Sequence, residues 1–287
     1  MFDNFIHQQV KTRETTINLV QGGSGDPILL LHGYPQTHVC WHLVAPILAE
    51  RFTVVCPDLR GFGDSGKPLS DPDHLAYSKR TMGQDQVEVM QILGFNEFAV
   101  VGHDRGARVA HRMALDHAEK ITKLALLDII PTRMAFANVD KEMATAAFNW
   151  FFSIQPDGLP ERLIGAEPDF YLQWCLDHWL GAEGSLAVEA VAEYKRCFDA
   201  EAIRATCEEF RAAASIDLIH DEADQEHKIS CPTLVLWSAN SMWATYDILE
   251  VWQTRAANVQ GAAFNCGHFL PEEDPERTAA ELIRFLS

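Results

Sequence analysis

The sequence predicts an α/β fold in which a mostly parallel, doubly wound sheet carries an inserted block of helices. Three observations support this prediction. Short, continuous apolar runs recur along the chain, helical segments lie between them, and the alternation stops over residues 132–228. Continuous apolar runs are typical of strands in a parallel sheet, because helices cover both of its faces.

The expected strands are residues 27–31, 52–56, 98–101, 123–127 and 233–237. Helices are expected at 79–93, 107–117 and 274–285, the last with Asp274 as its N-cap and Pro275 at its first position. Within the insertion, helices are expected at 141–152, 168–180, 184–198 and 201–214. We therefore expect a core domain of residues 1–131 and 229–287, with residues 132–228 as a helical cap domain over the strand ends.

The composition narrows the possible partners. A formal net charge of -18 opposes binding to nucleic acid or to an anionic membrane, and an anionic substrate would need a local group of cations. The 7 cysteines include no CxxC pair, which favours free thiols in a reducing compartment. The first ten residues lack the apolar stretch of a signal peptide, and no run is long enough for a membrane helix, so we expect a cytoplasmic protein.

The strongest motif is Gly102-His103-Asp104-Arg105-Gly106, which lies between an expected strand and an expected helix. It matches the nucleophile elbow G-x-S-x-G with an aspartate in the serine position. A carboxylate that attacked an ester would form an unfavourable anhydride, whereas displacement at a saturated carbon gives an alkyl ester that activated water can hydrolyse. Asp104 is therefore predicted to displace a halide or an epoxide oxygen.

The elbow architecture orders its partners as nucleophile, acid and histidine along the chain. His268 follows a glycine in the loop before the last helix, so it is the predicted general base. Asp128 ends the strand at 123–127 and is the predicted orienting acid, with Asp247 as the weaker candidate. The predicted oxyanion donors are the backbone N–H groups of Arg105 and Tyr34.

Two cations follow the predicted nucleophile. Arg105 and Arg108 are three residues apart and share a helix face. Cations at a helix N-terminus oppose the helix dipole by about 0.3–1 kcal/mol each, so they need an anionic partner. A substrate carboxylate would provide it through charge-assisted contacts, and acids of the protein itself are the alternative. The nucleophile and the arginines together predict a 2-halo acid as substrate.

Five segments of the sequence carry a resemblance to a known family: HGYPQTHVCWH, PDLRGFGDSGKP, GHDRGARVAHRMALDH, LLDIIPT and CGHFLPEEDPE. They resemble the fluoroacetate and haloacetate dehalogenases of the α/β-hydrolase fold, and the resemblance covers nearly the whole chain. It implies Asp104 as nucleophile, Asp128 and His268 as the pair that activates water, and Arg105 with Arg108 as the carboxylate site. It also implies a homodimer and no cofactor or metal.

Two positions depart from the family pattern. Defluorinating members carry a His-Trp pair and a tyrosine around the leaving fluoride, whereas this chain has Asn149-Trp150 and Phe210. Asn149 and Trp150 can still donate hydrogen bonds, but Phe210 cannot. Because fluoride is a poor leaving group, we expect chloroacetate or bromoacetate to be hydrolysed faster than fluoroacetate.

Two other functions are compatible with the sequence. An epoxide hydrolase would share the aspartate nucleophile and would need tyrosines such as Tyr171 and Tyr194 to protonate the epoxide oxygen. An inactive hydrolase fold could instead bind small acids as a receptor. The dinucleotide-like glycines at 61–66 are followed by Lys67-Pro68 and a loop rather than by a helix, so no dinucleotide is expected.

Overall fold

An eight-stranded sheet forms the centre of the computed structural model, which describes residues 1–287. The strands are β1 (Ile6–Lys11), β2 (Thr16–Gly23), β3 (Pro27–Leu31), β4 (Thr53–Pro57), β5 (Phe98–His103), β6 (Ile121–Leu127), β7 (Thr233–Ser238) and β8 (Val259–Phe264). Their order across the sheet is β1-β2-β4-β3-β5-β6-β7-β8. β2 pairs antiparallel with both β1 and β4, and every other pair is parallel.

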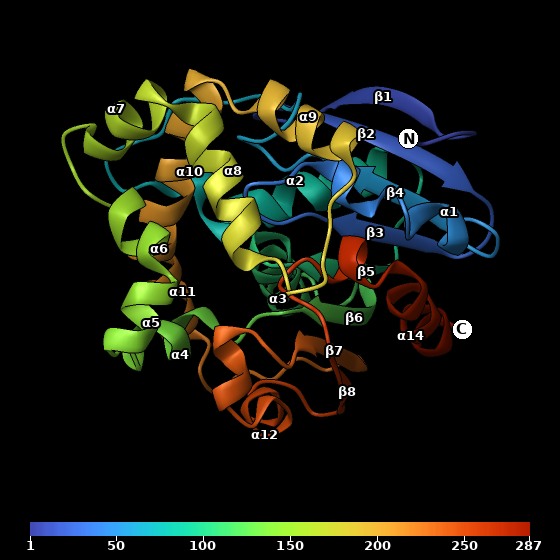
Figure 1. The fold of residues 1–287 in the computed structure, drawn as a ribbon. Coiled ribbons are helices and arrows are strands. Elements are labelled where there is room, and N and C mark those ends of the chain that lie inside the picture. Colours follow the sequence, from blue (N-terminus) through green and yellow to red (C-terminus); the bar gives the residue numbers. More distant parts are fainter.

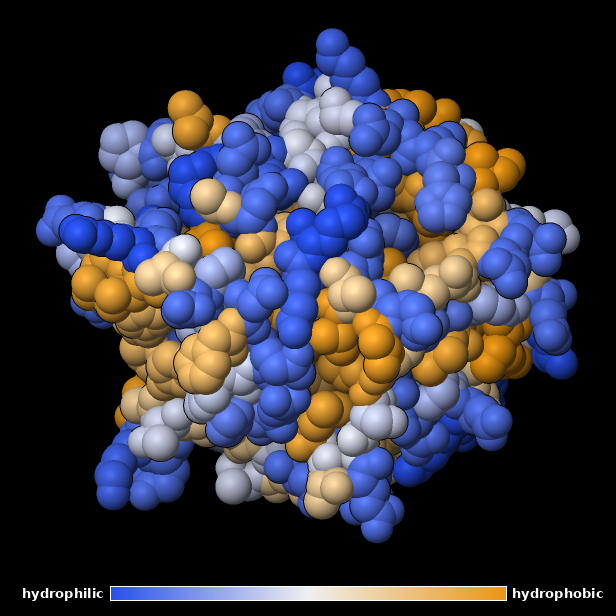
Figure 2. Space-filling view, turned by 45° about the horizontal axis from the view of Figure 1, so that its top comes forward, coloured by the Kyte–Doolittle hydropathy of each residue, from blue (hydrophilic) through white to orange (hydrophobic).

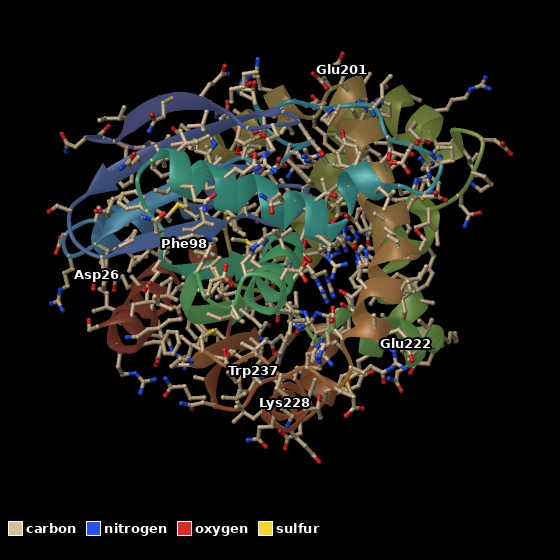
Figure 3. The ribbon with its side chains drawn as sticks, turned by 180° about the vertical axis from the view of Figure 1, so that it is seen from behind. Asp26, Phe98, Glu201, Glu222, Lys228 and Trp237 are labelled. Carbon is tan, nitrogen blue, oxygen red and sulfur yellow. The ribbon has the colours of Figure 1, made fainter.

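Helices cover both faces of this sheet. They are α1 (Ala45–Leu48), α2 (Lys79–Ile92), α3 (Arg105–Asp116), α12 (Ile248–Gln253), α13 (Leu270–Glu273) and α14 (Pro275–Leu286). α2 and α3 pack together against one face and stand in front of the sheet in Figure 3. α1 and α14 contact each other on the opposite face, which Figure 1 shows in front. The predicted fold class is therefore confirmed.

Between β6 and β7 the chain forms helices and the loops that join them, and no strand of the sheet (Figure 1). It forms α4 (Thr132–Ala137), α5 (Lys141–Ala146), α6 (Phe148–Ser153), α7 (Leu159–Ala166), α8 (Pro168–Trp179), α9 (Val188–Cys197), α10 (Ala200–Ala213) and α11 (Ile216–Ala223). One continuous buried cluster joins these helices to the sheet, since it contains Leu172 and Tyr194 as well as Val100 and Leu126. The helices are thus packed on the sheet through apolar side chains.

The differences from the sequence prediction are local. The helix expected at 141–152 is two helices, because Ala147 leaves the helical conformation at φ -98 and ψ 34. β1, β2 and β8 were not predicted as strands: β1 reads IHQQVK and is mostly exposed, so it lacks the apolar run that marks a buried strand. The short helices α1, α4, α7, α11, α12 and α13 were also missed.

The face of the molecule seen in Figure 2 has apolar patches between hydrophilic side chains. Leu159, Leu163 and Phe170 of α7 and α8 are among the exposed large apolar residues. No helix combines the length and the apolar character needed to cross a bilayer.

Candidate active site

Asp104 lies at the sharp turn between β5 and α3. Its backbone has φ 45 and ψ -116, a strained conformation that ordinary residues rarely adopt. The turn is possible because glycines allow close approach: a Cβ on Gly106 would lie 2.4 Å from the carbonyl oxygen of His32, and one on Gly33 would lie 2.7 Å from Cβ of Asp104. The turn therefore holds the Asp104 side chain above the carboxyl end of the sheet.

His268 stands between two carboxylates. Its Nδ1–H donates to Oδ2 of Asp128 over 2.7 Å, and its Nε2 lies 3.9 Å from Oδ2 of Asp104. Asp128 follows β6 directly, is fully buried, and its Oδ1 accepts a hydrogen bond of 2.9 Å from the Ser238 N–H. Asp247, the weaker candidate, instead caps α12 by accepting from Glu250 N–H. The structure thus brings Asp104, His268 and Asp128 together and leaves Asp247 apart.

Backbone N–H groups face the Asp104 carboxylate. The Tyr34 N–H donates to Oδ2 of Asp104 over 3.0 Å, so one carboxylate oxygen is held in place while the other is left to react. Arg105 begins α3, and its N–H is one of the first-turn donors that an α-helix leaves without an internal partner. Of the two donors expected from the sequence, Tyr34 contacts the predicted nucleophile, and the Arg105 N–H has no partner inside its own helix.

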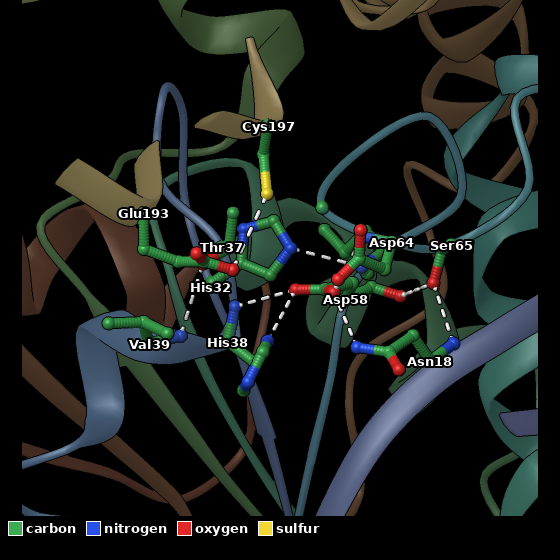
Figure 4. Close-up of polar contacts among 12 residues, drawn as sticks. Asn18, His32, Thr37, His38, Val39, Asp58, Asp64, Ser65, Glu193 and Cys197 are labelled. Atoms are coloured by element: carbon green, nitrogen blue, oxygen red, sulfur yellow. Dashed lines mark hydrogen bonds and ion pairs between the residues drawn. The ribbon is translucent and has the colours of Figure 1, made fainter. Parts of the chain in front are cut away.

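The loop that carries Tyr34 is anchored by a buried carboxylate. Asp58 accepts hydrogen bonds from the backbone N–H and the ring Nδ1–H of His38, both over 2.8 Å, and from the amide of Asn18 over 2.9 Å (Figure 4). Burial opposes the charge on Asp58, but its contacts with His38 lower its pKa below the ordinary value. Asp58 thereby ties the loop after β3 to the end of β4.

Charges in the cluster stabilise one another. Burial disfavours an ionised Asp104, but contact with His268 outweighs it and holds the pKa of Asp104 below its usual range. Burial also opposes protonation of His268, yet contact with Asp104 and Asp128 raises its pKa above 6.5. Before any reaction, the arrangement therefore favours an anionic Asp104 beside a protonated histidine.

The two arginines of α3 have different partners. Arg105 pairs with Glu209 of α10 through two contacts, Nε to Oε1 at 2.8 Å and Nη2 to Oε2 at 2.7 Å. Lys79 contacts the same carboxylate and also lies 3.2 Å from Asp217. Arg105 thus has the protein's own acid as a partner, which was the alternative to a substrate carboxylate.

Arg108 has no acidic partner within the chain. Its Nη1 donates to the Ile130 carbonyl over 3.1 Å and to the Thr132 hydroxyl over 2.9 Å, while Nε and Nη2 are buried without a hydrogen-bond partner. Burial and the neighbouring charge of Arg105 lower the pKa of Arg108 to about 10, so it still carries its charge at neutral pH. A buried cation with unused donors has the capacity to bind an anion, as predicted for Arg108 from the sequence.

A cavity of about 440 Å³ opens above Asp104 and His268. Asn149, Trp150 and Phe210 also line it, so the structure brings together the three residues at which the resemblance places the halide site. The guanidinium of Arg108 stacks on Trp150 at 4.7 Å, and that of Arg105 stacks on Phe210 at 4.4 Å. The arginines therefore lie directly behind the aromatic floor of the cavity.

Comparison with known proteins places the chain in a family. The family model described as "alpha/beta hydrolase fold" matches residues 26–275. The chain belongs to this family. It is 45% identical, over 100% of its length and 95% of the relative's, to the fluoroacetate dehalogenase of Burkholderia sp, so the resemblance seen in the sequence is confirmed.

Two further relatives span the whole of this α/β hydrolase. The soluble epoxide hydrolase of Corynebacterium sp. strain C12 is 33% identical, with the match covering 100% of this chain and 99% of that protein. The crystal structure of ALR0039 from Nostoc sp PCC 7120 superposes with a TM-score of 0.99 at 57% identity, covering 100% and 99% of the two chains. The relatives thus include proteins with two different activities.

Several residues of the site were missed by sequence reasoning. Glu209 meets Arg105 across 104 positions in sequence, and nothing in its own segment distinguishes it from the neighbouring Glu208. Trp179 supplies the carbonyl that accepts the His268 backbone N–H over 2.8 Å and also lines the cavity, but no local motif marks it. Trp243 lines the cavity from the segment after β7, in which no sequence motif marks a functional residue.

Proposed function

We propose that this α/β hydrolase is a haloacetate dehalogenase, which hydrolyses the carbon–halogen bond of a short 2-halo acid such as chloroacetate or bromoacetate to the hydroxy acid. One observation carries the proposal. The Asp104 carboxylate lines the cavity, and the buried, acid-free cation of Arg108 lies against Trp150, which lines the same cavity. A nucleophile for saturated carbon and a site for a carboxylate are the two features that this reaction requires. The 45% identity with a fluoroacetate dehalogenase supports it.

In the first step, the free oxygen of Asp104 attacks the carbon that bears the halogen. The carbon–halogen bond breaks with its electron pair, halide leaves, and an ester links Asp104 to the acid. The substrate carboxylate is assigned to Arg108, because the charge of Arg105 is already paired with Glu209. The departing halide receives hydrogen bonds from the Asn149 amide and the Trp150 indole, which both line the cavity.

In the second step, water attacks the ester carbonyl of Asp104. His268 accepts the proton from this water, and Asp128 stabilises the resulting imidazolium through its 2.7 Å hydrogen bond. The oxyanion is stabilised by the N–H groups of Tyr34 and Arg105. Formation of the ester removes the negative charge of Asp104, which helps to raise the pKa of His268. His268 therefore loses its proton more easily and can act as the base.

Epoxide hydrolysis is the alternative, since an epoxide hydrolase is 33% identical to the chain. That reaction needs an acid that protonates the epoxide oxygen. Tyr171 and Tyr194, the expected donors, do not line the cavity that contains Asp104. Tyr34 does line it, but burial raises the pKa of its hydroxyl well above 10 and makes it a weak acid. These observations favour the dehalogenase.

The decisive experiment uses His268→Asn incubated with chloroacetate, followed by intact-mass measurement. We expect one equivalent of chloride and a retained ester on Asp104, because the second step lacks its base. Asp104→Asn is the matched control and should gain no mass. A screen of epoxides on the unaltered enzyme tests the alternative. Binding of haloacids without mass gain or halide release would instead indicate a receptor.

The division of the chain and its assembly are also proposals. We assign residues 132–228 to a cap domain because they supply Asn149, Trp150 and Phe210 to the cavity, whereas the core supplies Asp104 and His268. The homodimer that the resemblance implies remains a prediction, which analytical ultracentrifugation of the purified protein tests.

A further inference from the structure

The cavity above Asp104 is larger than a haloacetate needs. Its volume is about 440 Å³. A haloacetate takes up roughly the volume of three or four water molecules of about 30 Å³ each, which is about a quarter of this space. The water molecule needed for ester hydrolysis occupies only about 30 Å³ more. About two thirds of the cavity, with its solvent-filled mouth included, then remains beyond the reacting atoms.

The groups that would hold a haloacetate gather at the inner end. Arg108 stacks behind Trp150, Asn149 is the neighbour of Trp150 on α6, and both of these cap residues are less than a tenth exposed. The mouth is formed instead by exposed residues, including Thr145 and Asn240. If the carboxylate and the halogen of a substrate are held at the inner end, any further substituent must point toward the mouth.

The wall along that direction is apolar and aromatic. Trp174, Trp179, Met242 and Trp243 line it, and the Trp243 ring lies 6.0 Å from that of Trp150. No carboxylate or ammonium group belongs to this part of the wall, and its polar lining residues include Ser241 and the exposed His178. Such a surface binds hydrocarbon and offers little to a polar chain.

We propose that the substrates of this site are 2-halo acids that carry an apolar substituent on C2, an alkyl chain of several carbons or an arylmethyl group. The substituent lies against Trp174, Met242 and Trp243 while the carboxylate and the halogen occupy the inner end. This inference rests on the proposed dehalogenase function and specifies its substrate class. Each buried methylene should tighten binding by about fourfold.

The test measures chloride release from chloroacetate, 2-chloropropanoate, 2-chlorobutanoate and 2-chlorohexanoate, each enantiomer separately, with kcat and KM resolved. Halide is displaced more slowly from a secondary carbon than from a primary one, which lowers kcat for the longer acids. KM is therefore the quantity that reports contact with the substituent. We expect KM of the better enantiomer to fall about fourfold per added methylene. A KM that rises with chain length, or turnover confined to chloroacetate, would overturn the inference and leave the dehalogenase intact. Chloride release from none of the acids would overturn both.

Two variants, one on α8 and one in the segment after β7, locate the substituent. Trp174→Ala and Met242→Ala should each raise KM for 2-chlorohexanoate at least about tenfold more than KM for chloroacetate. Phe170→Ala is the matched control, because Phe170 lies one turn earlier on α8, is 69% exposed and does not line the cavity. Equal effects of the wall variants on the short and the long acid would contradict the proposed contact.

Discussion

The residues that line the cavity predict that chloride or bromide is released faster than fluoride, because Phe210 cannot donate a hydrogen bond. The variant Phe210→Tyr tests this prediction by adding one hydroxyl group. Phe210 lines the cavity with its ring 5.2 Å from that of Tyr34 and beneath the Arg105 guanidinium. The substitution adds a single hydroxyl donor without changing the ring. A hydrogen bond to a charged partner contributes about 1.5–3 kcal/mol. If the departing fluoride accepts this hydrogen bond in the transition state, its displacement should be roughly 10- to 150-fold faster.

Chloride needs less assistance, so the same substitution should change chloroacetate turnover by no more than about threefold. The assay compares fluoride and chloride release from fluoroacetate and chloroacetate under identical conditions in both proteins. Phe198→Tyr is the control, since Phe198 lies near Tyr34 with ring centroids 6.3 Å apart but does not line the main cavity. If the unaltered enzyme released fluoride fastest, or if Phe210→Tyr left the fluoride-to-chloride ratio unchanged, the assignment of the halide site would be wrong.

Three further predictions concern the charged groups. Arg108→Gln should raise KM for chloroacetate roughly 10- to 100-fold in steady-state kinetics, because it removes the one cation without an acidic partner. Glu209→Gln leaves the Arg105 charge buried without its anion and should lower the free energy of unfolding by about 3–5 kcal/mol in urea denaturation. Hydrolysis of the ester needs neutral His268, whose pKa is raised, so its rate should fall as pH falls. Rapid quench followed by intact mass should then find more ester on Asp104 at pH near 5 than at pH near 8, and equal amounts would exclude His268 as the base.

The parts of the fold that could be predicted are those with a local cause. The strand at 27–31 was predicted with its observed limits, because a strand covered on both faces must be apolar throughout. β1 has solvent on its exposed side and therefore carries no such signal. The elbow was predicted for a similar reason: close packing of backbone against backbone requires Gly106 at a fixed distance from Asp104 in the sequence.

The parts of the site that could not be predicted depend on contacts between distant segments. The sequence placed Arg105 and Arg108 on one helix face but could not distinguish them, because the distinction lies in Glu209 on α10. Asn149 and Phe210 were identified through resemblance alone, since no periodicity or spacing relates α6 to the end of α10. The size of the cavity likewise depends on how helices after β6 pack over the sheet, which pattern reasoning does not measure.

The pairing of Arg105 with Glu209 bears on the charge of the substrate. If both arginines were free, the inner end of the cavity would offer two positive charges and would suit a dicarboxylate. Glu209 neutralises Arg105, and the Lys79 that shares this carboxylate has Asp217 as a further partner. One uncompensated cation, Arg108, is left to offset one anionic group. In a chain with a net charge of -18, a second substrate carboxylate would find no such cation and would be repelled, so we predict that monocarboxylates are bound in preference to dicarboxylates.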